Sequence, residues 1–354
     1  MYTEHPKPEV LVTMSITQSQ IDRLEKTCHV VKAGWGQNGV RLSEDELCEK
    51  MIDTDILLVG YEKITEKVIQ NAKKLKLIGV SRANPVNIDL DSVNSRKIPI
   101  IFAPGRNSIA AAEYTLGLMI NQARNITLGD KCLRSGKFLG ECQEILLADN
   151  PCNDVIWNLD GNTPYIQLRG SELAGKTLGL IGFGNVAARV AHLAKAFDMR
   201  VVTFTPERDR KRVSQTGIAM ISFEQLLDQS DFISLHCSVN DETKSILDAR
   251  AFSRMKSSVY VINTARASLI DQTALIDALS NNKIGGAALD VFWYEPLPGN
   301  HPLLKMDNVT LTPHLAGSTY EVPERHSRMI VDDVFAWLEN KKPRNLYNRD
   351  AIDR

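Results

Sequence analysis

One glycine-rich turn constrains the fold of this chain more than any other feature. The segment 179-GLIGFGNVAARVAHLAKAF-197 contains Gly182-Phe183-Gly184 and Ala187, directly after an apolar run and at the start of a run with helical character. Gly182 permits a tight turn, Gly184 lets a pyrophosphate approach the backbone, and the small Ala187 lets helix and strand pack closely. The unpaired N–H groups at the start of the helix then face an anion. The segment therefore predicts a dinucleotide-binding strand–turn–helix unit.

Short apolar runs alternate with amphipathic runs on both sides of this turn. Such alternation is typical of buried parallel strands with helices on both faces of the sheet. The predicted strands lie within 9–14, 55–60, 76–80, 98–103, 177–182, 200–204, 231–236, 259–263, 286–291 and 309–313. The predicted helices include 18–27, 64–74, a long helix that begins at Asn107 or Ser108, and 325–342, which has one apolar face. The fold class is therefore predicted as α/β with doubly wound parallel sheets.

Composition narrows the class of protein. At 354 residues the chain is long enough for two domains. A formal net charge of -1 argues against a nucleic-acid or membrane-surface partner. The N-terminus does not read as a signal peptide, and the six cysteines form no CxxC pair, so we expect a cytoplasmic protein with reduced thiols. No cluster of His, Asp or Glu has the spacing of metal ligands, and no metal site is predicted.

The strand after the glycine turn ends without the carboxylate that usually holds the adenine ribose. That acid is expected about 20 residues beyond the turn, where 201-VVTFTPERDR-210 has Thr205. A threonine hydroxyl can bond a ribose hydroxyl or a phosphate oxygen without repelling either, and Arg208 suits bidentate phosphate contact. The stretch favours NADP slightly over NAD. The alternative is a solvated loop in which Glu207 takes over the ribose.

Three ionisable residues lie at or just beyond the ends of late elements. They are Arg266 in 261-VINTAR-266, Glu295 in 289-LDVFWYEP-296, and His314 in 311-LTPHLAG-317. In an open α/β sheet the carboxyl ends of the strands line the ligand crevice. Reduction of a 2-oxo acid requires a cation for the substrate carboxylate, an imidazolium that protonates the carbonyl oxygen, and a carboxylate that orients the imidazole. Spacing alone does not select these three residues.

The sequence resembles the D-isomer-specific 2-hydroxyacid dehydrogenases over essentially the whole chain. Five segments match in order and spacing: 172-ELAGKTLGLIGFGNVA-187, 231-DFISLHCSV-239, 261-VINTARASLIDQTALIDAL-279, 287-AALDVFWYEP-296 and 311-LTPHLAG-317. The resemblance implies a flavodoxin-like substrate domain formed by 1–104 and 316–354. It implies an inserted Rossmann domain for NAD or NADP at 105–315, with the final helix packed back on the first domain. The implied reaction is hydride transfer between nicotinamide and a D-2-hydroxy acid or 2-oxo acid.

The resemblance also assigns roles to residues by position. Arg266 should bind the substrate carboxylate and polarise the carbonyl, His314 should be the acid–base, and Glu295 should be its partner. Asp290 should hold the nicotinamide carboxamide. The remaining cofactor contacts are expected from Gly182, Phe183, Gly184, Asn185, Val186, Thr205, Arg208, His236 and Thr264.

The substrate loop departs from the family pattern. Most members read R-x-G-x-G-x-D-N-x-D, whereas this chain reads 81-SRANPVNID-89, which is shorter and has proline and other residues in place of glycines. Because proline has no N–H to offer, we expect the substrate carboxylate at Ala83 or Asn84, or held more fully by the catalytic arginine. Arg82, Asn84 and Arg106 become candidates for selecting a longer, polar substrate such as a sugar-derived acid. The alternative for each is a solvated loop.

The stretch at about 138–172 breaks the strand–helix rhythm, and we interpret it as an arm in a homodimer contact. Two alternatives for the function stay open. One is the oxidation of formate or phosphite on the same fold. The other is a dinucleotide-sensing binding protein, like the transcriptional corepressors that share this fold and can keep all three ionisable residues. A regulated phosphoglycerate dehydrogenase is not expected, because the chain ends soon after the final helix.

Overall fold

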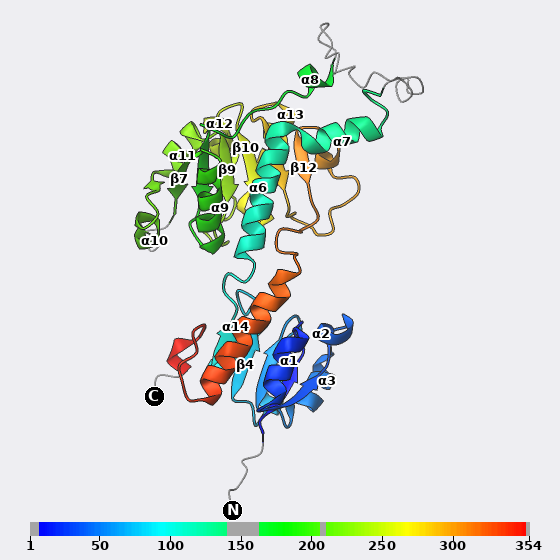
Figure 1. Ribbon diagram of the computed structural model, residues 1–354, viewed down its shortest axis with the longest axis vertical. Helices are drawn as coiled ribbons and strands as arrows, with labels where there is room; N and C mark the ends of the chain where they lie inside the picture. Colours follow the sequence, from blue (N-terminus) through cyan, green and yellow to red (C-terminus); the bar gives the residue numbers. More distant parts are fainter. Residues whose placement is uncertain (1–6, 140–162, 206–209, 352–354) are drawn as a thin grey trace, which may run out of the picture. The chain divides into compact units, whose positions relative to one another are not determined.

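The computed structural model describes residues 7–139, 163–205 and 210–351. The chain divides into two compact units: unit 1 comprises Met1–Asn107 and Ser318–Arg354, and unit 2 comprises Ser108–Gly317. Each unit is an α/β structure with its own parallel sheet (Figure 1). The predicted fold class is therefore confirmed. No helix in these described ranges has both the length and the apolar character needed to cross a membrane.

Unit 1 is built on a five-stranded sheet in the order β2-β1-β3-β4-β5, which is the flavodoxin-like order. Its strands are β1 (Glu9–Val12), β2 (His29–Lys32), β3 (Ile56–Val59), β4 (Leu77–Val80) and β5 (Ile100–Phe102). All but β2 lie within predicted runs. Strand β2 was not predicted, because this edge strand has no buried residue and therefore no apolar run.

Helices cover both faces of this sheet. They are α1 (Gln18–Glu25), α2 (Trp35–Asn38), α3 (Glu44–Met51), α4 (Glu66–Asn71), α5 (Leu90–Ser95), α14 (Glu321–Leu338) and the short η5 (Arg349–Ala351). Helices α3, α4 and α5 share a core with one face, and α1 and α14 share a core with the other. Ile330, Val331 and Val334 of α14 are fully buried there, each contributing about 1.5–3 kcal/mol. The apolar face of α14 is therefore covered by the sheet of unit 1.

His326 ties α14 to the carboxyl edge of the sheet. Its Nε2 donates to the carbonyl oxygen of Ser15 at 2.7 Å, and its Nδ1 lies 3.1 Å from Nη1 of Arg106, from which it accepts. The residue is only 4% exposed. Burial lowers the pKa of His326 to about 4; the bond to Ser15 acts in the opposite direction, and the charge of Arg106 adds to the lowering. The imidazole is therefore neutral at physiological pH, with its proton on Nε2.

We expect this histidine to make the protein acid-sensitive. In the unfolded chain its pKa has the ordinary value of 6.5, whereas folded His326 takes up a proton only near pH 4. Its contribution to stability is complete above pH 6.5 and is lost as the pH falls toward 4, at a cost of about 3 kcal/mol. A His326→Gln variant can keep the bond to Ser15 but cannot titrate. In urea unfolding, its free energy of unfolding should fall less than wild type between pH 7 and pH 4, and equal losses would contradict the prediction.

Unit 2 is built on a seven-stranded sheet in the order β12-β11-β10-β9-β6-β7-β8. Read from β6, this is the Rossmann order with one further strand at the β12 edge. The strands are β6 (Thr177–Ile181), β7 (Arg200–Phe204), β8 (Ala219–Met220), β9 (Phe232–Leu235), β10 (Tyr260–Asn263), β11 (Gly286–Leu289) and β12 (Val309–Leu311). Only the two-residue edge strand β8 lies outside the predicted runs.

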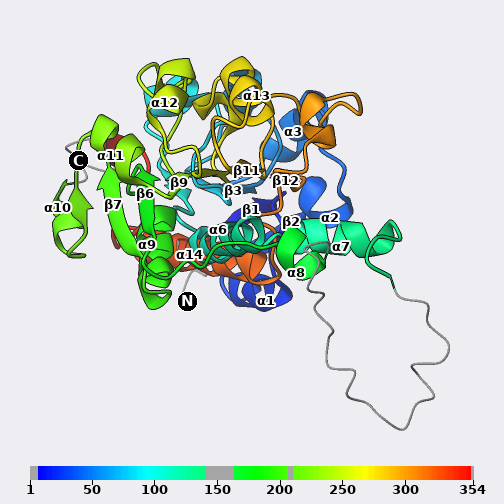
Figure 2. The ribbon, with the colours of Figure 1, turned by 90° about the horizontal axis from the view of Figure 1, so that it is seen from above.

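Helices again lie on both faces. They are α6 (Ser108–Arg124), α7 (Ile126–Arg134), α8 (Pro164–Gln167), α9 (Asn185–Ala196), α10 (Arg210–Ser214), α11 (Phe223–Gln229), α12 (Ala249–Arg254), η3 (Ala267–Leu269), α13 (Gln272–Ser280) and η4 (Pro302–Lys305). Helices α6 and α9 cover one face, and α11, α12 and α13 cover the other (Figure 2). Of the predicted arm, 140–162 lie outside the described residues.

Candidate active site

The glycine turn between β6 and α9 forms a backbone cradle. Gly182 has a φ of +90°, and a Cβ there would lie 2.7 Å from the backbone nitrogen of Cys237, so the chain excludes a side chain at this point. Gly184 is the N-cap of α9, and a Cβ there would meet no atom within 4 Å. The backbone of Gly184 and the exposed Asn185 therefore border open space. The unpaired N–H groups of a long helix start at this space, so the residues fit a dinucleotide pyrophosphate.

The side chains that follow the glycines pack inward. Phe183 is fully buried in the core beneath α9, together with Ala187, and Val186 packs against the same core. Only the backbone of Phe183 is therefore available to a ligand. The small Ala187 brings α9 close to the sheet and so fixes the direction in which the cradle faces.

Two residues that follow β9 and β10 have defined hydrogen-bond directions. His236 is partly buried, and its Nε2 lies 2.8 Å from Oγ of Ser234. Burial lowers the pKa of His236 to about 4, so this imidazole is neutral at physiological pH. The hydroxyl of Thr264 lies 2.8 Å from that of Thr115 on α6, and Thr115 donates to the carbonyl oxygen of Ala111. Thr264 must therefore donate to Thr115, which leaves only acceptor capacity on its other side.

Thr205 directly follows β7 and is 3% exposed. Arg208, which the sequence analysis placed beside the cofactor, lies outside the described residues. Thr205 therefore lies at the end of the second strand of the dinucleotide fold.

His314 and Glu295 lie in contact. Nδ1 of His314 is 2.8 Å from Oε2 of Glu295, and Oε1 of Glu295 accepts the backbone N–H of Phe292 at 3.0 Å. Burial raises the pKa of Glu295, but the bonds from His314 and Phe292 and the charges of His314 and Arg266 outweigh it, so the net shift is downward. The carboxylate therefore stays ionised and holds Nδ1. The other ring nitrogen, Nε2, is left as the one that can exchange a proton with a ligand.

A buried carboxylate fixes the turn that presents His314. The backbone of His314 is left-handed, with a φ of +59°. Asp290, which is 0% exposed, accepts from Oγ1 of Thr312 at 2.7 Å, from N of Leu315 at 2.8 Å and from N of Ala316 at 2.8 Å. Three hydrogen bonds that one carboxylate accepts thus define the backbone on both sides of the imidazole.

Arg266 is an exposed residue in the turn after β10. Its Nη1 donates to the carbonyl oxygen of Ala265 at 2.6 Å. The buried Asn263 clamps this turn, because its Nδ2 donates to the carbonyl oxygen of Arg266 at 2.9 Å and its Oδ1 accepts from N of Ala265 at 3.0 Å. Asn263 was not among the predicted site residues. A polar residue at the end of the apolar run 259-VYVIN-263 is the signal that could have found it.

The loop that carries Glu295 is anchored to the segment that follows Arg266. Nε1 of Trp293 donates to the carbonyl oxygen of Ile270 at 3.1 Å. The indole also stacks on the imidazole of His301, with centroids 6.5 Å apart, and that imidazole lies 2.9 Å from Nε2 of Gln272. Neither Trp293 nor His301 was among the predicted site residues. Together they hold the glutamate loop and the arginine turn in one frame.

The four substrate-binding candidates all belong to unit 1. Ala83 and Asn84 are exposed in the loop after β4. Arg82, in the same loop, lies over the ring of Tyr61, and Arg106 after β5 donates to His326.

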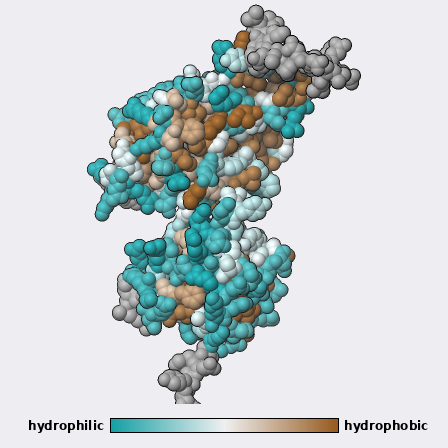
Figure 3. All heavy atoms as spheres, viewed as in Figure 1, coloured by the Kyte–Doolittle hydropathy of each residue, from teal (hydrophilic) through white to brown (hydrophobic). Residues whose placement is uncertain are grey.

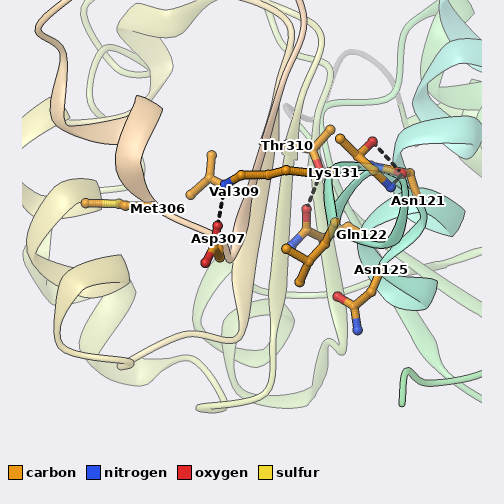
Figure 4. Close-up of a pocket in the computed structure, with 10 residues that line it drawn as sticks. Asn121, Gln122, Asn125, Lys131, Met306, Asp307, Val309 and Thr310 are labelled. Carbon is orange, nitrogen blue, oxygen red and sulfur yellow. Dashed lines mark hydrogen bonds and ion pairs between the residues drawn. The ribbon is translucent and has the colours of Figure 1, made fainter. Parts of the chain in front are cut away.

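A hollow on the surface of unit 2 is too small to be a substrate site. It lies between the C-terminal end of α6 and β12, with a volume of about 50 Å³ (Figure 4). Lys131 pairs with Asp307 at 2.6 Å, and Thr310 donates to Gln122 at 2.8 Å. Its volume is that of about one or two water molecules. Among the residues that the structure describes, no group of three His, Cys, Asp or Glu side chains could hold a metal ion.

The fold and this site define an α/β protein whose unit 2 combines a dinucleotide cradle with a histidine–carboxylate pair. Residues 116–316 match the family described as D-isomer specific 2-hydroxyacid dehydrogenase, NAD binding domain. The chain belongs to this family, whose members are oxidoreductases.

Curated relatives match nearly the whole chain. It is 34% identical to the glyoxylate reductase of Thermofilum pendens, over 98% of this chain and 96% of that protein. It is 33% identical to the D-3-phosphoglycerate dehydrogenase of Archaeoglobus fulgidus, over 98% of this chain but only 60% of that protein.

Solved structures share the fold over the same extent. The TT0316 protein of Thermus thermophilus is 30% identical with a TM-score of 0.75, covering 96% of this chain and 99% of that one. An acyclic imino acid reductase in complex with NADPH and D-Arg is 26% identical with a TM-score of 0.76 and the same coverage.

Proposed function

We propose that the chain is an NAD(P)-dependent oxidoreductase that interconverts a D-2-hydroxy acid and the corresponding 2-oxo acid. The observation that carries the proposal is the contact between His314 and Glu295, on a turn that the buried Asp290 fixes, in the same unit as the glycine cradle. When bound, the nicotinamide supplies or accepts the hydride.

His314, Glu295 and Arg266 each have one role in the proposed reaction. Nε2 of His314 gives a proton to the carbonyl oxygen during reduction and takes it back from the hydroxyl during oxidation. Glu295 holds Nδ1 and stabilises the charged imidazolium. Arg266 binds the substrate carboxylate through two parallel N–H bonds, which a guanidinium is shaped to form.

The cofactor would be held by backbone more than by side chains. Gly182, Phe183, Gly184, Asn185 and Val186 are proposed to surround the pyrophosphate, with only the backbone of Phe183 taking part. Thr264 and the neutral His236 are proposed to border the cofactor beyond it. The hydroxyl of Thr264 would face the cofactor as an acceptor, because its proton is given to Thr115.

Asp290 takes two roles in the proposal. The family resemblance assigns it to the nicotinamide carboxamide. Its three hydrogen bonds to the backbone and hydroxyl around His314 support a second role as the positioning residue of the acid–base.

We expect Asp290→Asn to disturb this position strongly. An amide has one acceptor oxygen, so its NH₂ group faces a buried backbone donor and costs about 1–3 kcal/mol of stability. A displaced His314 should also lower kcat for 2-oxo acid reduction, by about 10²-fold if it moves by 1 Å. Calorimetry and steady-state kinetics test both effects.

Asp271→Asn is the matched control. Asp271 caps α13 by accepting from N of Ala274, and asparagine caps a helix about as well as aspartate does. The same chemical change should therefore leave kcat and the melting temperature of this control close to wild type. Equal losses in both variants would contradict a special role for Asp290.

NADP is proposed as the slightly favoured cofactor. Thr205 occupies the position where a carboxylate would repel a 2′-phosphate, and Arg208 is proposed to contact that phosphate. The solved structure of the acyclic imino acid reductase, which is 26% identical, is in complex with NADPH. Fluorescence titration with NADPH and NADH tests this. Tighter NADPH binding that falls to parity in Arg208→Ala supports it, and preference for NADH contradicts it.

Turnover tests the reaction itself. Purified protein is assayed with NADPH or NADH and glyoxylate, pyruvate or hydroxypyruvate. Oxidation of the dinucleotide that requires His314 supports the proposal. Dinucleotide binding without flux on any 2-oxo acid would favour a sensor instead. Flux on formate or phosphite alone would favour the other dehydrogenase type.

A homodimer is proposed through the end of unit 2 that carries α7 and α8. Large apolar side chains are exposed there, and Figure 3 shows brown, apolar surface in the upper part of the view. They include Ile126, Leu133, Tyr165 and Ile166. Such a cluster is more typical of an interface than of solvent-facing surface.

We expect Leu133→Arg to shift the protein toward the monomer, because a buried unpaired charge destabilises an interface. Light scattering after size exclusion distinguishes a 39.5 kDa monomer from a dimer of twice that mass. Ser253→Arg, on the exposed surface of α12, adds the same charge elsewhere and should not change the mass. A wild-type monomer would overturn the dimer.

A further inference from the structure

A carboxylate is buried in unit 1 without a side-chain cation to balance it. Glu62 follows β3 and is 0% exposed. Its Oε1 accepts the backbone N–H of Trp35 at 2.8 Å, but its Oε2 has no hydrogen-bond partner among the described residues. In the same ranges, no lysine, arginine or histidine forms an ion pair with Glu62. Because a buried carboxylate loses its hydration, this arrangement is costly unless an opposite charge lies against it.

Two further side-chain oxygens of unit 1 are buried and unpaired within the described ranges. They are Oγ1 of Thr13, a residue that follows β1 and is 0% exposed, and Oδ1 of Asn87, in the loop after β4. The amide of Asn87 is oriented by its nitrogen, because Nδ2 donates to the carbonyl oxygen of Glu62 at 2.7 Å. Its Oδ1 is therefore the atom that is left as an acceptor.

Hydrogen bonds bring these three residues together at the carboxyl edge of the sheet. The N–H of Trp35 bonds the carboxylate of Glu62, and the N–H of Gly36 bonds the carbonyl oxygen of Thr13 at 2.8 Å. Thr13 and Glu62 thus hold adjacent residues of one turn, and Asn87 bonds the backbone of Glu62. The strands that precede them, β1, β3 and β4, are consecutive in the sheet. The three unpaired oxygens therefore belong to one cluster of loops.

We propose that Glu62, Thr13 and Asn87 hold a monovalent cation, Na⁺ or K⁺, inside unit 1. A carboxylate, a hydroxyl and an amide carbonyl are oxygen donors of the kind that hard cations bind. One carboxylate supplies one negative charge, so a monovalent cation makes the buried site neutral, whereas a divalent cation would leave a net charge. A water molecule could bond the same oxygens but would not balance the carboxylate. The inference does not depend on the proposed reaction.

Melting temperatures in different salts test the site. Wild type should melt at a higher temperature in NaCl or KCl than in choline chloride at the same concentration, because the ionic strength is constant and only the small cations fit among the three oxygens. The salt that gives the larger rise identifies the ion. Equal melting temperatures in all three salts would overturn the proposal. A rise that requires MgCl₂ or CaCl₂ would overturn the assignment to a monovalent ion.

Thr13→Val gives results of opposite sign with and without a bound ion. Valine has nearly the shape of threonine, so the loss of a buried hydroxyl that has no partner should leave the melting temperature unchanged or raise it. The loss of an ion ligand should instead lower the melting temperature, by about 2–4 °C or more. We expect this loss in the salt of the bound ion and not in choline chloride. A stabilised variant in every salt would contradict the site.

Glu62→Gln removes the charge and keeps an acceptor for the N–H of Trp35. This variant should melt at the same temperature in all three salts. Glu49→Gln removes an exposed carboxylate of α3 in the same unit and should keep the full rise. A full rise in Glu62→Gln would mean that the ion binds elsewhere and would overturn the proposal. Thr13→Val, which keeps the carboxylate, decides the question if Glu62→Gln does not fold.

Discussion

Replacing His314 with asparagine is expected to lower kcat for 2-oxo acid reduction by about 10²–10⁴-fold, the usual contribution of a general acid–base. Asparagine is chosen because it tolerates the left-handed backbone, which is at a φ of +59° here. Its amide can still donate to Glu295, but it has no proton to give to a carbonyl oxygen at neutral pH. The change therefore removes the chemistry and keeps the turn that Asp290 fixes.

The readouts separate a catalytic defect from a structural one. Steady-state kinetics give kcat, and fluorescence titration gives dinucleotide affinity, which should stay as in wild type because the glycine cradle is untouched. His192→Asn, on the exposed side of α9, makes the same substitution away from the pair and should retain full activity. A His314→Asn variant with wild-type kcat would remove the central residue from the proposal.

Much of the fold follows from local sequence, because its signals are short. The runs that became β3, β4 and β6 are fully buried strands, and a run of apolar residues bounded by turns predicts such strands without knowledge of their neighbours. The glycine turn is equally local, because it depends on φ at Gly182 and on space above Gly184.

What escaped prediction depends on partners far along the chain. The edge strand β2 has no buried residue, so only its pairing with β1 defines it. Near the C-terminus, the N–H of Tyr347 bonds the carbonyl oxygen of Ile100, and the N–H of Phe102 bonds that of Asn345. The hydrophobic periodicity of either segment does not predict a hydrogen-bond partner more than 200 residues away.

The candidate site divides in the same way. The residue types at 266, 295 and 314 suggested a chemistry, but only the family resemblance selected them from other charged residues. Sequence could not show that the side chain of Phe183 is buried, or that the carboxylate of Asp290 is surrounded by the backbone of the histidine turn. Nor could it show that Arg106 would meet a neutral imidazole from α14. These facts depend on turn geometry and on packing between distant elements.

Arg266→Ala is the second change with a large expected effect. Two hydrogen bonds between charged groups contribute about 1.5–3 kcal/mol each, so their loss should lower kcat/KM for a 2-oxo acid by about 10²-fold or more. Both KM and kcat should change, because the proposed arginine binds the carboxylate and polarises the carbonyl. The backbone of Arg266 is extended, and alanine adopts that conformation without strain.

Two further variants make the result specific. Arg266→Lys keeps the positive charge but loses the fork of parallel donors, so its kcat/KM should lie between those of Ala and wild type. Arg254→Ala removes an arginine of α12 that pairs with Asp228 at the surface, where such pairs contribute little; its kinetics should match wild type. Full kcat/KM in Arg266→Ala would mean that another group binds the substrate carboxylate and would contradict the role proposed for this arginine. A loss of dinucleotide affinity equal to the loss of kcat/KM would instead assign Arg266 to the cofactor.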